Sequence, residues 1–325
     1  MKFNFNDKAH TKYSAKQRQI LIKEIKDTFE RKLAMQLKLL RVSAPIIVEK
    51  ETGLNDDLCG SRKVEFDAAG APDKTLQVVQ SLAKWKRYAL KKYGFTAGEG
   101  LYTDMIAIRR DEDLDALHSL YVDQWDWEKV ITDKQRTLDF LYKTVRKIIR
   151  AVTQTASAVS KKTGAHLVTP YPEIFFITSK ELEKLYPNLS AERREYEIVK
   201  THKTVFLSQI SQQRASDYDD WTLNGDILFY HEVLDCVLEL SSGGIRVNSE
   251  SLRHQLQQSN EVHKLKFDYH AQVMSGELPL TIGGGIGQSR LCMLLLGSAH
   301  IGEVQASFWP QCELDWCKKN DIDLL

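Results

Sequence analysis

The segment YVDQWDWEK, residues 121–129, constrains the fold of this chain more than any other stretch. Successive side chains of a β-strand point to opposite faces of the sheet, so this segment separates into two sets. The aromatic set is Tyr121, Trp125 and Trp127. The polar set is Gln124, Asp126 and Glu128. The aromatic set predicts a face packed in a core, whereas the polar set fits a functional site and a solvent-exposed sheet face equally well.

The bulk composition excludes several classes of protein. The 325 residues carry 45 Lys and Arg against 44 Asp and Glu, and a net charge of +1 gives no general attraction to nucleic acid or anionic lipid. The start MKFNFNDKAH lacks an apolar signal segment, and no window approaches the roughly 20 apolar residues that cross a bilayer. The 5 cysteines are scattered without a CxxC pair, which indicates reduced thiols rather than a zinc site. We expect a soluble, cytoplasmic protein of one domain, without a nucleic-acid or membrane partner.

Two long helical stripes and a series of short strands predict the fold class. From Ser14 an S-x-x-Q capping box leads into apolar residues at spacings of three and four, up to about Leu40. A second stripe begins at Leu138. Pro45 favours a sheet edge for VSAPIIVEK, and short strand-like runs follow from residue 174 without regular βαβ alternation. The predicted fold is therefore α+β, a mainly antiparallel β-sheet flanked by helices.

An arginine pair, Arg109 and Arg110, ends the strand-like run GEGLYTDMIAI. A planar guanidinium at a strand end can bind a phosphate or carboxylate through two parallel hydrogen bonds. The alternative is a surface ion-pair cluster, which contributes little to stability, with the three acids that follow at positions 111–113. The local pattern alone favours the surface cluster.

Glu239 lies inside the apolar run VLDCVLEL. Because an unpaired buried carboxylate is costly, we expect a cation, a metal ion or hydrogen-bond donors beside it. This expectation favours a magnesium or nucleotide role over a structural salt bridge with Arg246. Asp226, in NGDILFY, is a weaker member of the same set because NGD is also an ordinary turn sequence.

The segment TIGGGIGQSRLCMLLL joins a glycine-rich stretch to a helix whose first turn contains Arg290. Glycines let a ligand approach the backbone closely, and a helix N-terminus favours anions. No GK[ST] follows the glycines, so the segment is not a Walker loop, and it lacks the context of a dinucleotide fingerprint. A glycine run followed by an arginine, together with an arginine at an upstream strand end, is a much stronger signal than the glycines alone.

These paired features resemble the catalytic core of class II aminoacyl-tRNA synthetases. Residues 14–48 resemble its first motif, a helix and a strand with a proline that mediate dimerisation. Residues 101–130 resemble its arginine-bearing hairpin, and residues 281–296 resemble its glycine-rich strand and following helix. More closely, seven blocks are similar to signatures of the ammonia-dependent asparagine synthetases: SLAKWKR, GEGLYT, LHSLYVDQWDWE, DYDDW, LNGDI, ELSSGGIRV and TIGGGIGQSRL. The resemblance covers nearly the whole chain, from about residue 14 to residue 310.

The resemblance implies a single catalytic domain over residues 1–325, a homodimer, and a two-step reaction at one site. The side-chain carboxylate of L-aspartate would attack the α-phosphate of ATP, giving a β-aspartyl adenylate and pyrophosphate. Ammonia would then displace AMP and leave L-asparagine. A carboxylate accepts an amine poorly until its oxygen becomes part of a good leaving group, and magnesium with arginine neutralises the phosphate charge.

The resemblance also implies roles for individual residues. The catalytic set is Arg109, Asp56 and Arg290. The residues that would bind aspartate are Asp56, Ser81, Lys86, Gln124 and Asp126. The residues of the nucleotide side would be Arg109, Asp219, Asp226, Glu239, Ser241, Ser242, Arg246, Gly285 and Arg290. Mg²⁺, which accompanies ATP, would contact Glu239 and Asp226.

Two short connections depart from the family pattern. The family usually carries a longer loop before DYDDW and another between that block and LNGDI, where this chain has SQISQQRAS and the single residue Thr222. Joining Trp221 to Leu223 through one residue is abrupt for two such blocks. We therefore hypothesise that the residues of an active-site lid are missing from the sequence at both places.

Three other readings of the chain make different predictions. A relative that binds tRNA would normally carry an anticodon-binding domain or a basic extension, and neither is visible. A catalytically silent sensor would be expected to lose one of Arg109, Glu239 and Arg290, all of which are present. A glutamine-using synthetase typically needs an N-terminal Cys, whereas position 2 is Lys2.

Overall fold

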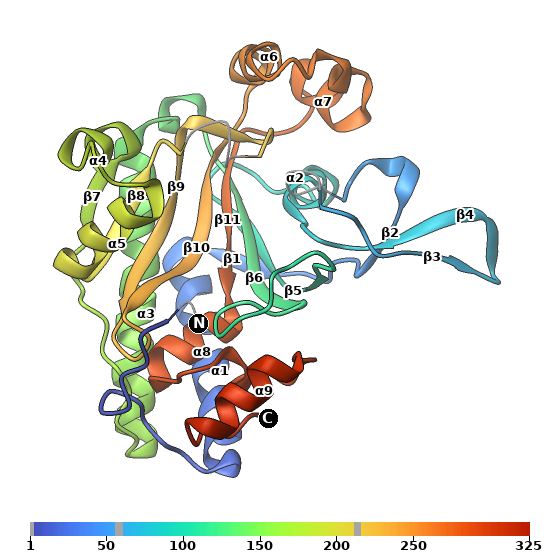
Figure 1. The fold of residues 1–325 in the computed structure, drawn as a ribbon. Helices are drawn as coiled ribbons and strands as arrows, with labels where there is room; N and C mark the ends of the chain where they lie inside the picture. The colour runs from blue at the N-terminus through green and yellow to red at the C-terminus, as the bar shows by residue number, and fades with distance from the viewer. Residues whose placement is uncertain (1–2, 56–60, 211–215) are drawn as a thin grey trace.

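The computed structural model describes residues 3–55, 61–210 and 216–325 (Figure 1). The strands of this part of the chain are β1 (Leu39–Arg41), β2 (Ile47–Glu49), β3 (Glu65–Ala68), β4 (Ala71–Val78), β5 (Gly100–Ile108), β6 (Tyr121–Val130), β7 (Phe175–Thr178), β8 (Thr204–Ser208), β9 (Asp219–His231), β10 (Cys236–Arg246) and β11 (Thr281–Gly287). The α-helices are α1 (Ala15–Leu37), α2 (Ala83–Lys92), α3 (Leu138–Thr163), α4 (Ser179–Leu185), α5 (Ala191–His202), α6 (Ser249–Gln258), α7 (Asp268–Met274), α8 (Gln288–Leu296) and α9 (Gln311–Lys319). Short 3₁₀ helices are η1 (Lys50–Thr52), η2 (Asp133–Gln135), η3 (Val262–Lys266) and η4 (Ile301–Glu303).

Two sheets organise the described residues. The main sheet has the strand order β1-β5-β6-β11-β10-β9-β8-β7, and the small sheet has the order β2-β4-β3. Pairing is antiparallel throughout, except between β1 and β5 and between β7 and β8. The small sheet projects to one side of the main sheet in Figure 1. The predicted α+β class is confirmed, and Pro45 lies between β1 and β2, each of which is the edge strand of its sheet, as predicted.

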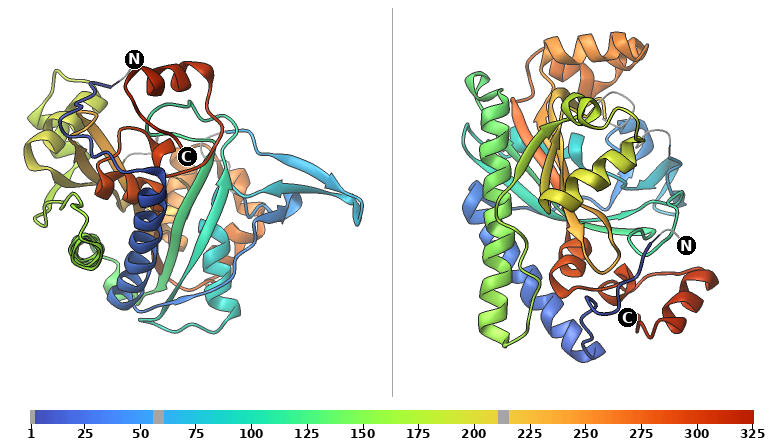
Figure 2. Two further views of the ribbon diagram at one scale, coloured as in Figure 1. Left: turned by 90° about the horizontal axis from the view of Figure 1, so that it is seen from below. Right: turned by 60° about the vertical axis from the view of Figure 1, so that its left-hand side comes forward.

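One face of the main sheet is covered by helices. Helix α1 begins with the predicted capping box, in which the Ser14 side chain accepts from the Gln17 amide. It ends at Leu37, slightly before the predicted end, because Lys38 adopts a left-handed backbone conformation with φ of 59°. Helix α3 runs alongside α1 (Figure 2), and together with α8 these helices form one core with Trp125 and Trp127.

The opposite face of the main sheet carries α2 over one part and α4 and α5 over another, and it also lines a cavity. Helix α2 contacts β5, β6 and β11, and two of these strands hold predicted site residues: Gln124 and Asp126 in β6 and Gly285 in β11. Buried Arg87 fixes α2, since its Nε donates to the Pro279 carbonyl at 2.8 Å and its Nη1 to the Val247 carbonyl at 2.9 Å. Within residues 3–55, 61–210 and 216–325, no helix combines the length and apolar character needed to cross a membrane.

Candidate active site

A cavity of about 580 Å³, called the central cavity below, lies over the polar face of the main sheet. Every predicted site residue that the structure describes lines it: Ser81, Lys86, Arg109, Gln124, Asp126, Asp219, Asp226, Glu239, Ser241, Ser242, Arg246, Gly285 and Arg290. Asp56 lies outside the described residues. Segments more than 200 residues apart in the sequence, from Ser81 to Arg290, therefore meet at one cavity.

Strand β6 separates its tryptophans from its polar side chains as its sequence predicts, but Tyr121, which was predicted for the core face, lines the central cavity. Trp125 and Trp127 are buried in the core formed with α1 and α3. Gln124 and Asp126 line the central cavity, while Glu128 on the same face is fully buried. The polar face is therefore not a solvent-exposed sheet face, and the functional-site alternative is favoured.

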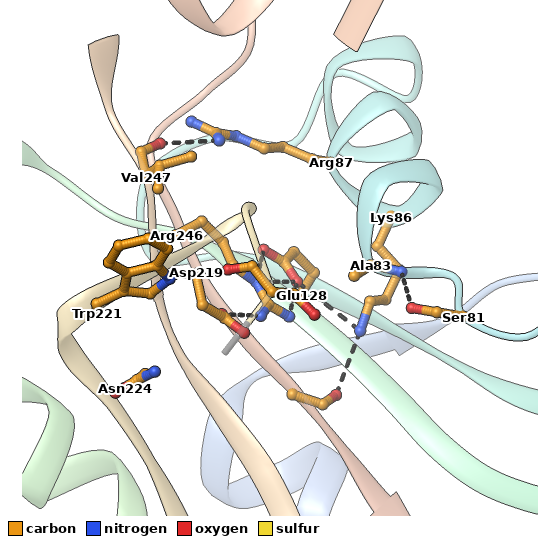
Figure 3. Close-up of polar contacts among 12 residues, drawn as sticks. Ser81, Ala83, Lys86, Arg87, Glu128, Asp219, Trp221, Asn224, Arg246 and Val247 are labelled. Atoms are coloured by element: carbon orange, nitrogen blue, oxygen red, sulfur yellow. Dashed lines mark hydrogen bonds and ion pairs between the residues drawn. The ribbon is translucent and has the colours of Figure 1, made fainter. Parts of the chain in front are cut away.

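Beside this strand, five charged side chains form a buried group that we call the Lys86 network: Lys86, Asp126, Glu128, Asp219 and Arg246. Lys86 pairs with Asp126 and lies 3.8 Å from Glu128 Oε2. Arg246 Nη2 lies 2.9 Å from the same Glu128 oxygen, and its Nη1 pairs with Asp219. Figure 3 shows four of them, Lys86, Glu128, Asp219 and Arg246, which converge from α2, β6, β9 and β10.

The pKa shifts in the Lys86 network show how its charges are balanced. Burial alone would raise the pKa of Glu128, but Arg246 and Lys86 hold it below its ordinary value. Burial raises the pKa of Asp219 despite the attraction of Arg246. Burial would lower the pKa of Arg246, but Asp219 and Glu128 keep it well above its ordinary value. Of Glu128 and Asp219, Glu128 is thus the carboxylate whose neighbours hold it ionised.

The environment of Glu239 differs from the one that the sequence predicts. Its side chain is 40% exposed rather than buried, because Leu238 and Leu240 take the core face of β10. The alternative of a structural salt bridge with Arg246 is wrong, since Arg246 pairs with Glu128 and Asp219. Arg290 instead approaches Glu239, with Nη1 4.0 Å from its Oε1 and 2.8 Å from its backbone carbonyl.

Arg109 does not belong to a surface ion-pair cluster. Asp111 pairs with Arg62, and Arg110 donates to the Lys63 carbonyl at 3.5 Å. The Nε of Arg109 is buried at the central cavity and makes no hydrogen bond within the described part of the chain. The surface cluster, which the local sequence pattern favoured, is therefore wrong for Arg109, and its binding of a phosphate or carboxylate stays a prediction.

The glycine run has a packing role that the sequence did not reveal. In β11, Gly283 pairs with Glu128 of β6 and Gly285 pairs with Asp126. A Cβ on Gly283 would overlap the Glu128 carboxylate, and a Cβ on Gly285 would overlap the Gln124 carboxamide. These glycines therefore leave room for the side chains of the neighbouring strand, in addition to lining the cavity floor at Gly285.

The short connection at Thr222 forms part of a continuous strand. Strand β9 runs from Asp219 to His231, with a register irregularity opposite residues 244–246. The Thr222 amide donates to Asp220 Oδ1 at 3.1 Å. The hypothesis that loop residues are missing at this join stays a prediction, which the full-length gene sequence would test. The other connection, SQISQQRAS, includes residues 211–215, which lie outside the described residues.

Several cavity-lining residues were not singled out from the sequence, among them Asp123, His118 and Ser289. Asp123 accepts hydrogen bonds from the Ser289 amide at 3.0 Å and from Lys26 Nζ at 2.7 Å. Strand alternation assigns Asp123 to the same face as Trp125 and Trp127, so the sequence pattern did not mark it as a site residue. The sequence signal that could have identified His118 is the acid three residues before it, Asp115. In the structure, His118 Nδ1 lies 2.7 Å from Asp115 Oδ1.

Comparison with known proteins gives both a family and a fold. A model of the family described as aspartate-ammonia ligase matches residues 16–321. A protein of Bacillus mycoides named aspartate–ammonia ligase is 51% identical, over 96% of this chain and 98% of its own. One from Lactobacillus johnsonii with the same name is 51% identical, over 93% of each chain.

Solved structures with a similar fold are more distant in sequence. Asparaginyl-tRNA synthetase from Pyrococcus horikoshii, complexed with asparaginyl-adenylate, matches with a TM-score of 0.68 and 16% identity, over 90% of this chain and 70% of its own. Asparaginyl-tRNA synthetase from Entamoeba histolytica matches with a TM-score of 0.66 and 18% identity, over 90% of this chain and 67% of its own. These likenesses establish the class II aminoacyl-tRNA synthetase fold. The family match, together with relatives that are 51% identical over nearly their full length, shows that the chain belongs to the aspartate–ammonia ligase family.

Proposed function

We propose that this chain catalyses the ATP-dependent synthesis of L-asparagine from L-aspartate and ammonia through a β-aspartyl adenylate, releasing AMP and pyrophosphate. The observation that carries this proposal is the central cavity, which gathers arginines, a lysine and carboxylates from the second and third class II motifs and from α2, β9 and β10. The family membership supports the same reaction. It is an activity that needs a phosphate-binding end and an amino-acid-binding end in one cavity.

Arg109 and Arg290 would bind the phosphates of ATP. They lie on separate elements that line the same cavity, just after β5 and in the first turn of α8. Guanidinium groups on two sides of an α-phosphate would neutralise charge that develops as the aspartate carboxylate attacks. Ser241, Ser242 and Gly285 would line the nucleotide beside them.

Lys86, Gln124 and Asp126 would bind aspartate, with Ser81 at the edge of the same pocket. Lys86 would contact a substrate carboxylate, while Asp126 would contact the substrate ammonium. Asp56 keeps its proposed role in this group from the sequence alone. Because Lys86 also pairs with Glu128 and Asp126, its ammonium is already oriented before substrate arrives.

Magnesium would enter with ATP and contact Glu239 and Asp226. These carboxylates lie on the adjacent strands β10 and β9, and both line the central cavity. The described residues offer no group of three or more metal-ligating side chains, so the donor set fits an ion held by one or two carboxylates plus substrate phosphates and water. When bound, the ion would help to neutralise the phosphate charge.

The proposed assembly is a homodimer formed through the first motif. Large apolar side chains are exposed along this region: Met35 at 75% and Leu40 at 61%, with Ile46 and Ile47 also exposed. Exposed apolar groups on an edge strand and its flanking helix favour a protein interface. Analytical ultracentrifugation of the unmodified protein should show a dimer, and replacing Leu40 by Lys should shift it toward monomer. A monomeric unmodified protein would contradict the assembly.

Fractionation of cells would test the proposed cytoplasmic location.

Purified protein incubated with aspartate, ATP, Mg²⁺ and ammonium tests the proposed reaction. We expect asparagine and AMP in equal amounts, measured by chromatography. Formation of ADP would indicate an acyl-phosphate route and contradict the proposed roles. The absence of any product would favour a silent sensor.

A further inference from the structure

A second cavity, of about 660 Å³, adjoins the central cavity. The two cavities share four of their lining residues: Leu117, His118, Glu239 and Arg290. The second cavity is also lined by Glu192 and Arg193 of α5, whose side chains are exposed. The second cavity therefore borders the central cavity at a junction that includes His118.

At this junction His118 and Asp115 form a hydrogen-bonded pair. His118 Nδ1 lies 2.7 Å from Asp115 Oδ1, which also accepts the Leu117 amide at 2.8 Å and the His118 amide at 3.0 Å. A carboxylate at Nδ1 keeps the ring proton on that nitrogen and leaves the Nε2 lone pair available. Within the described part of the chain, Nε2 makes no hydrogen bond. The pair thus holds the imidazole ring in a fixed orientation.

The turn that carries this pair is anchored at several points. The Ile301 amide donates to the Ala116 carbonyl at 2.8 Å, and the Ser119 and Ser307 hydroxyl oxygens lie 2.7 Å apart. The Arg109 amide donates to the Leu120 carbonyl at 2.9 Å. His118 is therefore held in a defined position relative to Arg109, which would bind the α-phosphate.

The proposed function, on which this inference rests, requires ammonia with a free lone pair. In neutral solution the donor is mainly ammonium, which must lose a proton before it can attack. We propose that ammonium enters through the second cavity and that Nε2 of His118 accepts its proton. The other charged groups at the junction are Glu239 and Arg290, which approach each other at 4.0 Å, and neither has the carboxylate-oriented ring of His118.

The proposed step balances as follows. Ammonium transfers one proton to His118 and becomes ammonia. Its nitrogen forms a bond to the β-carbonyl carbon of the aspartyl adenylate, and the bond from that carbon to the phosphate oxygen breaks. The nitrogen then releases a second proton to the AMP phosphate or to water. The products are asparagine and AMP, and protonated His118 returns its proton to solvent through the second cavity.

Replacing His118 by Asn, with hydroxylamine as an alternative nucleophile, tests the inference. Hydroxylamine is largely uncharged at neutral pH and needs no base to free its lone pair. For H118N we expect about a 10²-fold loss of asparagine formation from ammonium, because a general base typically contributes 10²–10⁴-fold. Aspartyl hydroxamate formation from hydroxylamine and aspartate-dependent ATP–pyrophosphate exchange should change little.

Two further variants sharpen this test. D115N, which weakens the orientation of the ring, should show a smaller loss with the same preference for hydroxylamine. H254N, which changes an exposed histidine of α6, is the matched control and should behave as the unmodified protein. Equal losses with both nucleophiles, a fall in pyrophosphate exchange, or no effect of H118N would overturn the assignment. A failure of the unmodified protein to catalyse exchange would instead contradict the proposed function.

Discussion

The central cavity holds two groups of charged residues that are paired to different degrees. The Lys86 network is buried and its members are paired with one another. In the second group, Arg109 has a buried Nε without a partner in the described residues, and Arg290 donates to the Glu239 carbonyl at 2.8 Å but lies 4.0 Å from Glu239 Oε1. Paired groups are oriented before substrate arrives, whereas less paired cations are available for an incoming anion. The comparison predicts that the Lys86 network governs folding and that Arg109 and Arg290 govern adenylation.

Replacing Glu128 by Gln should have the largest effect on stability. Gln keeps the shape but removes the charge that compensates Arg246 and Lys86. Breaking one partner of a buried ion pair costs about 3–5 kcal/mol, and denaturant unfolding would measure that loss. D27N, which breaks the exposed pair with Lys23, is the control and should leave the unfolding midpoint unchanged. Equal midpoints for E128Q and D27N would show that the network does not support the fold.

Replacing Arg109 by Gln should impair chemistry and leave folding intact. Removing one charged donor from a developing negative charge typically costs about 10²–10³-fold, so aspartate-dependent ATP–pyrophosphate exchange should fall by that factor. Arg110 provides the matched control, since it is exposed and hydrogen-bonds only to the Lys63 carbonyl among the described residues. R110Q should retain exchange; a similar loss in both variants would show that overall charge, not the position of Arg109, matters.

The features that local sequence could predict are those set by neighbouring residues. The cap at Ser14, the α1 stripe and the alternation of β6 depend on short spacings, and the structure confirms them. The exposure of Glu239 was missed because burial of a strand residue depends on which sheet face the helices cover. Likewise, the role of Gly283 depends on its register with Glu128, more than 150 residues away in sequence.

The candidate site shows the same limit. The residues of the central cavity were found largely through family blocks, since local patterns left Arg109 and the polar face of β6 undecided. Asp123 was hidden by alternation, and the contact of His118 with two cavities exists only in three dimensions. The structure gives the position of every predicted site residue except Asp56, while their roles in binding stay predictions.

Alanine substitutions at Gly283 and Gly285 should distinguish the effect of the Lys86 network on stability from the effect of the proposed aspartate pocket on substrate binding. In G283A the new Cβ would overlap the Glu128 carboxylate and the Trp127 carbonyl, so we expect destabilisation of about 1–3 kcal/mol. In G285A the Cβ would meet the end of the Gln124 side chain, which can rotate away. G285A should therefore raise the KM for aspartate with a smaller loss of stability. The opposite order in unfolding experiments would contradict the arrangement of β6 and β11.

Acid unfolding should show the smallest effect. Because Arg246 and Lys86 outweigh burial, the folded pKa of Glu128 lies below its ordinary 4.5. Its contribution to stability is thus fully present above about pH 4.5 and is lost as the pH falls through the folded pKa. The stability difference between the unmodified protein and E128Q should narrow below pH 4.5. A difference that stays constant on acidification would show that Glu128 is not held ionised by the network.

The most direct test of the proposed function follows one oxygen atom. Aspartate labelled with ¹⁸O in its side-chain carboxylate would be incubated with the protein, ATP, Mg²⁺ and ammonium, and AMP would be analysed by mass spectrometry. A β-aspartyl adenylate requires that one labelled oxygen remain on the phosphate when ammonia displaces AMP. Labelled AMP in amounts equal to asparagine is the predicted result, and asparagine formed with unlabelled AMP would contradict the adenylate route.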